Sequence, residues 1–190
     1  MRIMGVDPGT RIVGYGVVET QGNRILAVAH GVIKADMKGD YSVRLRSIHD
    51  GLAQMIRLHG PNVVAIEEAF YGKSASSALR MGEGRGVAIV TAALADLPLC
   101  QYTPAEVKKA VVGNGRAHKS QIQEMVRVLL GMPAVPEPED AADALAVAIC
   151  HCNRRTTDHA LHLAGPESDG ATRGHAFRPH SFRITRSSIH

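Results

Sequence analysis

The chain has 190 residues, of which 45% are hydrophobic and 21% charged, a composition typical of one globular domain large enough to bury a core. No apolar run reaches the roughly 18 residues that a membrane span needs, and no charged segment followed by an apolar stretch opens the chain, so we expect neither membrane insertion nor secretion. Its three cysteines lack the paired CxxC spacing of a zinc site and fit a reducing compartment, so we expect a cytoplasmic protein.

The net charge of +4 is unevenly distributed along the chain. Residues 154–190 hold six Arg against three acidic residues, which leaves a net charge of only +1 on residues 1–153. The same segment is rich in Gly, Ser and His and shows no apolar period, a composition typical of disorder. We therefore divide the chain into an ordered domain, residues 1–153, and a disordered basic tail, residues 154–190. A polyanion bound to the ordered domain must meet a local patch of positive charge.

The sequence of the first part of the domain predicts three strands joined by short links. They span residues 2–7, 12–18 and 24–33, with the tight turn Pro8-Gly9-Thr10 between the first two. Three consecutive strands of this kind predict an antiparallel meander and argue against a doubly wound start. Apolar residues at helical spacing then predict an amphipathic helix over residues 41–59.

Helices and strands alternate in the rest of the domain. A continuous apolar run predicts a central strand over residues 61–67. The sequence Thr103-Pro104-Ala105-Glu106 is a capping box with Pro at the first helical position, so a helix should begin there. The other predicted elements are a helix over residues 74–95, a strand over 97–102, a helix over 118–130 and a last helix from 139 to about 153.

Four acidic residues stand where these patterns predict burial. Asp7 and Glu67 end predicted strands, while Asp140 and Asp143, at i and i+3, project from one face of an almost wholly apolar helix. Each has an ordinary explanation when taken alone. Asp7 suits the start of a turn before Pro-Gly, Glu67 suits a pair with Lys or Arg, and acids in a first helical turn complement the helix dipole.

The dipole explanation suffices for Glu137, Glu139 and Asp140, but Asp143 lies one turn further in, where an unpaired carboxylate is costly. Taken together, carboxylates without His or Cys favour Mg²⁺ or Mn²⁺ over zinc. Two such ions would activate a water and stabilise the leaving oxygen in phosphodiester hydrolysis.

Seven segments, three of which contain these acids, resemble a known family when they are taken in order. They are residues 4–16, 65–70, 85–90, 107–108, 111–113, 119–121 and 140–146. Together they resemble the RuvC-type Holliday junction resolvases over roughly the first four-fifths of the chain. The tail, residues 154–190, is not included in the resemblance.

The resemblance implies an α/β, ribonuclease H-like fold with a mixed five-stranded sheet flanked by helices. It implies a homodimer that makes paired, Mg²⁺-dependent nicks in four-way DNA junctions. The carboxylate chemistry above also admits Mn²⁺, with two ions per active site. In such enzymes the catalytic and metal-binding carboxylates match Asp7, Glu67, Asp140 and Asp143. A branch-migration helicase complex of the RuvA and RuvB type is then the expected partner.

The predicted DNA contacts begin just after the strand that ends at Glu67. Phe70 and Tyr71 stand beside Gly72-Lys73-Ser74, a loop position that favours an exposed ring able to stack on an unpaired base over a core aromatic. The resemblance likewise matches Phe70 to a residue that stacks at the junction centre. Candidate phosphate contacts are Lys73, Arg80, Lys108, Lys109, Arg116 and Lys119. Solvated helix faces are the alternative for most of them, and Lys108 and Lys119 match family positions near the active site.

Two other functions compete with a nuclease. An ATP-binding protein of the actin and Hsp70 kind has a phosphate loop like Asp7-Pro-Gly-Thr10, but such proteins duplicate the fold, and here no second Asp-x-Gly-Thr loop appears. A junction-binding protein without catalysis would need no carboxylate cluster.

The glycines of residues 82–86 lack the GxGxxG spacing and favour close helix packing. Cys150, His151 and Cys152 diverge around a helix, so we interpret the cysteines as thiols rather than metal ligands.

Overall fold

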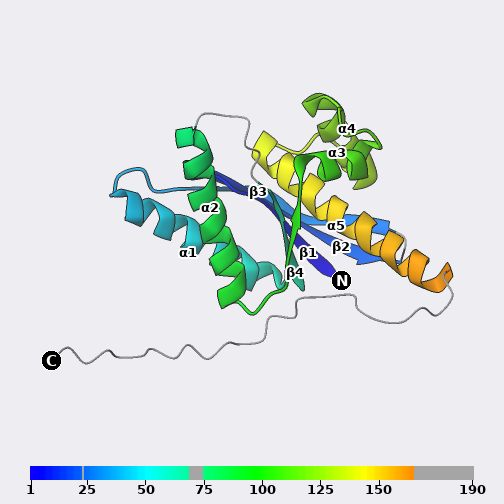
Figure 1. The fold of residues 1–190 in the computed structure, drawn as a ribbon, viewed down its shortest axis with the longest axis horizontal. Helices are drawn as coiled ribbons and strands as arrows, with labels where there is room; N and C mark the ends of the chain where they lie inside the picture. Colours follow the sequence, from blue (N-terminus) through cyan, green and yellow to red (C-terminus); the bar gives the residue numbers. More distant parts are fainter. Residues whose placement is uncertain (23, 69–74, 165–190) are drawn as a thin grey trace.

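A five-stranded sheet lies between two layers of helices in the computed structural model, which describes residues 1–22, 24–68 and 75–164 (Figure 1). The strands are β1 (Arg2–Asp7), β2 (Ile12–Gln21), β3 (Arg24–Lys34), β4 (Val63–Glu67) and β5 (Leu99–Tyr102). The helices are α1 (Tyr41–His59), α2 (Ala75–Leu94), α3 (Pro104–Val112), α4 (Lys119–Leu129) and α5 (Glu139–Ala164). Across the described residues, no helix combines the length and the apolar character of a membrane span.

The sheet is mixed, with strand order β3-β2-β1-β4-β5. The first three strands form the predicted antiparallel meander, and β4 and β5 then add in parallel to β1. The predicted five-stranded sheet is confirmed. The parallel pair β1 and β4 matters most for function, because their carboxyl ends meet at one edge of the sheet.

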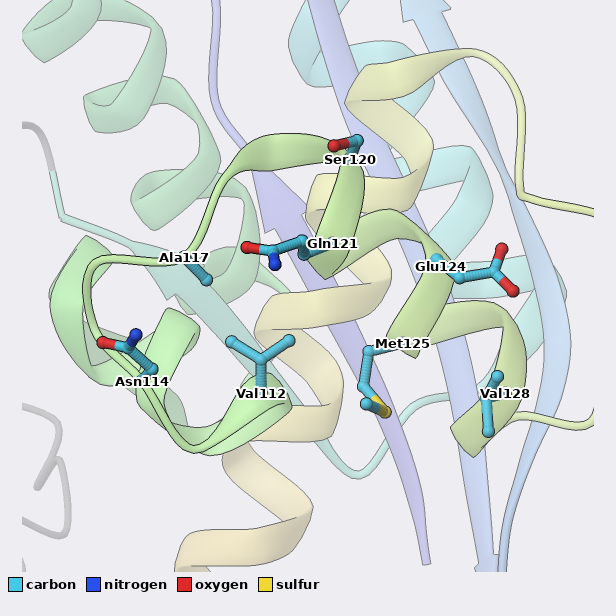
Figure 2. A pocket seen from close by; sticks show the side chains of 8 residues that line it. All are labelled: Val112, Asn114, Ala117, Ser120, Gln121, Glu124, Met125 and Val128. Carbon is cyan, nitrogen blue, oxygen red and sulfur yellow. The ribbon is translucent and has the colours of Figure 1, made fainter.

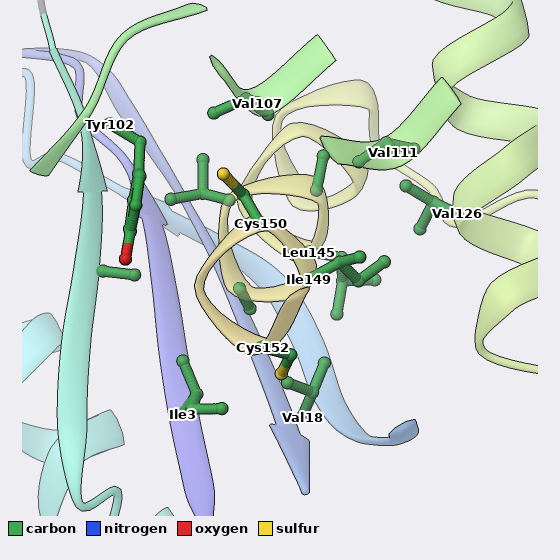
Figure 3. Packing of buried hydrophobic residues seen from close by; sticks show 14 of the residues in the cluster. Ile3, Val18, Tyr102, Val107, Val111, Val126, Leu145, Ile149, Cys150 and Cys152 are labelled. Atoms are coloured by element: carbon green, nitrogen blue, oxygen red, sulfur yellow. The ribbon is translucent and has the colours of Figure 1, made fainter. Parts of the chain in front are cut away.

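Alternation along the strands sends neighbouring side chains into two separate cores. Ile3 of β1 and Ala65 of β4 pack with α3, α4 and α5, in the core whose larger members are drawn in Figure 3. Met4 and Ile66, the next residues along those strands, pack with α1 and α2 on the other face. Each face of the sheet is therefore covered by its own helices.

Helix α5 approaches the sheet more closely than side chains would normally permit, because β1 and β2 present glycines to it. A Cβ at Gly14 would overlap the backbone carbonyl oxygen of Asp140, and one at Gly5 would overlap that of Ala144. Gly16 lies against Leu145 in the same way. Glycine inside a strand permits such backbone contact. The first turns of α5 consequently lie directly on the β1–β2 pair.

Local sequence signals elsewhere are well reproduced. The capping box of α3 is present, with the Thr103 hydroxyl accepting from the Glu106 amide and the Glu106 carboxylate accepting from the Thr103 amide. Gly84 of α2 packs on the turn after β1, where a Cβ would lie 2.6 Å from the carbonyl oxygen of Gly9. Cys150 and Cys152 are both buried in the core.

The end predicted for the last helix was wrong. Helix α5 continues to Ala164 instead of ending near residue 153. An established helix extends at little cost per residue, so polar composition alone does not end it. Arg154 also forms an ion pair with Glu106 of α3, which ties the continuation to the domain. The division into a domain of residues 1–153 and a disordered tail of residues 154–190 stays a prediction, and residues 165–190 lie outside the described part of the chain.

The contact between α5 and β2 predicts the effect of a single methyl group. Gly14→Ala should lower the free energy of unfolding by about 1 to 3 kcal/mol, because α5 must move away from the added Cβ. Gly86→Ala is the matched control. A Cβ there has no neighbour within 4 Å, so Ala should stabilise α2 by up to about 1 kcal/mol. Urea denaturation measures both, and an unchanged midpoint for Gly14→Ala would contradict the close packing.

Candidate active site

Two carboxylates end adjacent parallel strands. Asp7 is the last residue of β1 and Glu67 the last of β4, and the preceding residues, Val6 and Ile66, are paired in register. Because side chains alternate along a strand, Asp7 lies on the same face as Ile3, and Glu67 on the same face as Ala65. Both acids therefore lie on the face that α5 covers.

Helix α5 brings two more acids to the same edge. Gly14 is the register partner of Asp7, and the Asp140 backbone packs directly on Gly14. Asp143 follows at i+3, on the same side of the helix. The four acids that the sequence singled out therefore converge from β1, β4 and α5, although up to 136 positions separate them along the chain.

These acids lie close enough together to raise one another's pKa. Burial, together with the charges of Glu67, Asp143 and Asp140, raises the pKa of Asp7 to about 7, against the opposing effect of Lys119. Burial and the Asp143 charge also raise the pKa of Glu67 to about 7, against the opposing effect of Lys108 and Lys119. Burial likewise raises the pKa of Asp143. The site therefore holds more negative charge than its neighbours neutralise.

Two lysines border the acids. The Lys119 Nζ, at the start of α4, lies 3.1 Å from Asp143 Oδ2 and 2.9 Å from Glu139 Oε2. Burial works to lower the pKa of Lys119, but its hydrogen bonds to Glu139 and Asp143 outweigh burial and raise the pKa overall. Lys108 of α3 joins Lys119, Glu67 and Asp143 around a pocket of about 180 Å³, together with Pro104, Val107, Ile122 and Ala146. Acidic and basic groups thus share one opening at the edge of the sheet.

A larger pocket, of about 560 Å³, lies between α3 and α4 but contains different chemistry (Figure 2). Its wall includes the apolar side chains of Val112, Met125 and Val128. Glu124 is its only acidic residue and is already paired with Arg127. This pocket lacks the converging carboxylates, so we do not identify it as the catalytic site.

The remaining predicted DNA contacts are placed less directly. Arg80 lies on an exposed part of α2 and does not line the pocket of Glu67 and Asp143. Phe70, Tyr71 and Lys73 lie outside the described residues. Lys108 and Lys119 do lie beside the acids. Contact of any of these residues with DNA stays a prediction.

The donor set fits a hard divalent cation. All four acids carry carboxylates, which suit Mg²⁺ or Mn²⁺, and the raised pKa of Asp7 and Glu67 reflects a charge that a cation would neutralise. With the side chains as they stand in the described residues, no three His, Cys, Asp or Glu groups are close enough to share one ion. The ammonium of Lys119 is the cation paired with Asp143 instead. Metal binding by these four acids stays a prediction.

The family model for the crossover junction endodeoxyribonuclease RuvC matches residues 3–151, which include all four acids. The chain belongs to this family. It is 51% identical to the RuvC of Syntrophotalea carbinolica over 86% of this chain and 97% of that protein. It is 49% identical to the RuvC of Geotalea uraniireducens over 80% of this chain and 89% of that protein.

A solved structure agrees with these relatives. The chain is similar to Thermus thermophilus RuvC in complex with a Holliday junction substrate, with a TM-score of 0.78 and 32% identity over 83% of this chain and 96% of that one. This likeness confirms the predicted ribonuclease H-like fold. Membership of the RuvC family makes the chain a crossover junction endodeoxyribonuclease, a hydrolase, and decides against the actin-type ATPase.

One residue of the site was missed by sequence reasoning. Glu139 was interpreted only as a first-turn acid that complements the helix dipole, yet it shares Lys119 with Asp143. The spacing of Glu139 and Asp143, i and i+4, was the available signal, because residues so spaced lie on one face of a helix. Its partner Lys119 belongs to a different helix, which no local pattern could name.

The raised pKa of Asp7 predicts a stability that depends on pH. The folded-state pKa, about 7, exceeds the ordinary value of 3.8, so ionised Asp7 destabilises the metal-free fold. The penalty is absent below pH 3.8, grows up to about pH 7 and is complete above it. Asp7→Asn should therefore stabilise the metal-free protein by a few kcal/mol at pH 8, at about 1.4 kcal/mol per pKa unit, and by less at pH 5.

Urea denaturation in EDTA at pH 5 and pH 8 measures this difference. Asp50→Asn is the control, since Asp50 lies on α1 in an exposed pair with Arg46 and should show no such pH-dependent gain. Equal effects of Asp7→Asn at the two pH values would show that Asp7 does not carry the penalty.

Proposed function

We propose that the chain resolves four-way (Holliday) DNA junctions by metal-dependent, paired nicking of two strands. The observation that supports this most strongly is the convergence of Asp7, Glu67, Asp140 and Asp143 at one edge of the sheet, in a member of the RuvC family. A relative of the same fold has been solved with a Holliday junction substrate, which supports the choice of DNA substrate.

The four carboxylates would hold Mg²⁺, or Mn²⁺, at two ions per active site. When bound, such ions activate a water and stabilise the leaving oxygen of a phosphodiester. The carboxylates supply the negative charge and fix the ligand positions. Because Asp7 and Glu67 end paired strands, the sheet would hold their backbones in place against the mutual repulsion of the carboxylates until a cation binds.

The lysines bordering the acids suit the substrate rather than the metal. Lys108 and Lys119 line the same pocket as Glu67 and Asp143 and carry the opposite charge. A phosphate drawn to these ammonium groups would be positioned beside the carboxylates. Phe70 and Tyr71, just after β4, would stack on bases opened at the junction centre, and Lys73 and Arg80 would contact the phosphate backbone.

The assembly follows from the symmetry of the reaction. Two nicks in equivalent strands require two active sites, which a two-fold homodimer supplies. A branch-migration helicase complex of the RuvA and RuvB type is the proposed partner, on the resemblance alone. Cys100, Cys150 and Cys152 form no disulfide within the described residues, which is consistent with action in the cytoplasm.

The amide variants of the four acids test the site. Asp7→Asn, Glu67→Gln, Asp140→Asn and Asp143→Asn should each lower the cleavage rate of a synthetic mobile four-way junction by more than about 100-fold, the upper end of the effect of residues that only support metal ligands. Junction binding should persist, because the amide keeps the shape of the side chain. Glu68→Gln is the matched control, since this neighbouring acid follows the end of β4 and does not line the pocket of Glu67 and Asp143.

Cleavage of the junction and of a linear duplex of the same sequence is measured with Mg²⁺ and with EDTA. Cutting of the junction only, and only with Mg²⁺, is expected. If two or more single variants cut at near the wild-type rate, the site is wrong. Equal cutting of duplex and junction would contradict the function, and binding without cutting by the wild type would favour the non-catalytic alternative.

A further inference from the structure

Glu139 lies beside the active site without belonging to the four converging acids. It begins α5, and its Oε2 lies 2.9 Å from the Lys119 Nζ. Asp143, one turn later on the same face, contacts the same ammonium from 3.1 Å. One lysine of α4 thus joins two carboxylates of α5.

The two carboxylates differ in their surroundings. The Asp143 side chain is 27% exposed and lines the pocket with Glu67, whereas the Glu139 side chain is 70% exposed and does not line it. A metal ion bound at the acids would take Asp143 from Lys119. Glu139 would then be the anion that remains in contact with the ammonium.

We propose that Glu139 is a positioning residue that keeps the Lys119 ammonium at the rim of the active site when a metal ion occupies Asp143. This inference rests on the proposed function. The ammonium is then held where a substrate phosphate enters, and it does not compete with the metal for Asp143.

The backbone at Lys119 supports this role because it is fixed. Lys119 follows the capping residue His118, whose amide donates to Gln121 Oε1 at 3.0 Å, and Ile122 is buried in the core. The side chain of Lys119, by contrast, is 52% exposed and rotates about four bonds. Its position therefore depends on the anions that it meets, and Glu139 is one of two among the described residues.

Helix-dipole stabilisation is the ordinary role of an acid in a first turn, and a surface ion pair adds little stability. Both roles would change the free energy of unfolding, and neither by itself would change cleavage by the folded protein. A positioning role instead requires that Glu139 act only through Lys119. Glu137, an exposed acid that forms no ion pair within the described residues, provides a control with the same change of charge.

The first measurement is the acylation rate of Lys119 by an amine-reactive ester, followed by mass spectrometry with and without Mg²⁺, with exposed Lys38 as the internal reference. An ion-paired ammonium reacts slowly. In wild type and in Glu137→Gln, Lys119 should stay protected when Mg²⁺ is added. In Glu139→Gln, Mg²⁺ should increase its labelling about three- to tenfold, the size expected for loss of one charged contact. Unchanged labelling in Glu139→Gln would overturn the proposal.

The second measurement is a double-mutant cycle on single-turnover junction cleavage at saturating Mg²⁺. Glu139→Gln should slow cleavage about three- to tenfold with Lys119 present and have no further effect in Lys119→Met. Equal slowing in both backgrounds, or by Glu137→Gln, would overturn the positioning role. If wild type fails to cut at all, the proposed function fails, and the labelling of Lys119 still decides the role of Glu139.

Discussion

The backbone contact between α5 and the β1–β2 pair is the constraint on which the active site depends. At Gly14 the strand has no side chain, so the Asp140 backbone rests on the strand itself. Any Cβ there would displace α5 and with it both of its acids. Because Gly14 is the register partner of Asp7, this contact also determines which strand residue the helix acids meet. The packing of α5 on β2 thus determines where the acids of the helix meet those of the strands.

That arrangement is electrostatically unfavourable in the absence of a cation. Burial and mutual repulsion raise the pKa of Asp7 and Glu67 to about 7, and Lys119 and Lys108 offset only part of the charge. The rest of the fold must supply the stability that the site removes, which the two apolar cores on either face of the sheet do. An unneutralised cluster in an otherwise well-packed protein is typical of a site built for a charged ligand.

The two faces of the sheet contribute differently to this site. Helices α3, α4 and α5 all pack on the face that carries Asp7 and Glu67, and they supply the other acids and both lysines (Figure 1). Helices α1 and α2 cover the opposite face, and α2 supports the turn after Asp7 through Gly84. The lysines come from α3 and α4, which pack against α5, and Lys119 therefore reaches two acids of α5.

Much of the fold was determined by the sequence itself, because helix periodicity, strand alternation and capping are local properties. The helix over residues 41–59 and the capping box at Thr103 were predicted correctly. The four acids that the sequence singled out do lie at one edge of the sheet, and their roles in metal binding and catalysis stay predictions. The end of α5 was not, since its continuation to Ala164 depends on helix extension and on contacts such as Arg154 with Glu106. Only the tertiary structure showed that the Asp140 backbone packs on Gly14 and that Lys119 forms ion pairs with both Glu139 and Asp143. Such contacts link segments that are remote along the chain, and their partners are selected by packing, which no local pattern encodes.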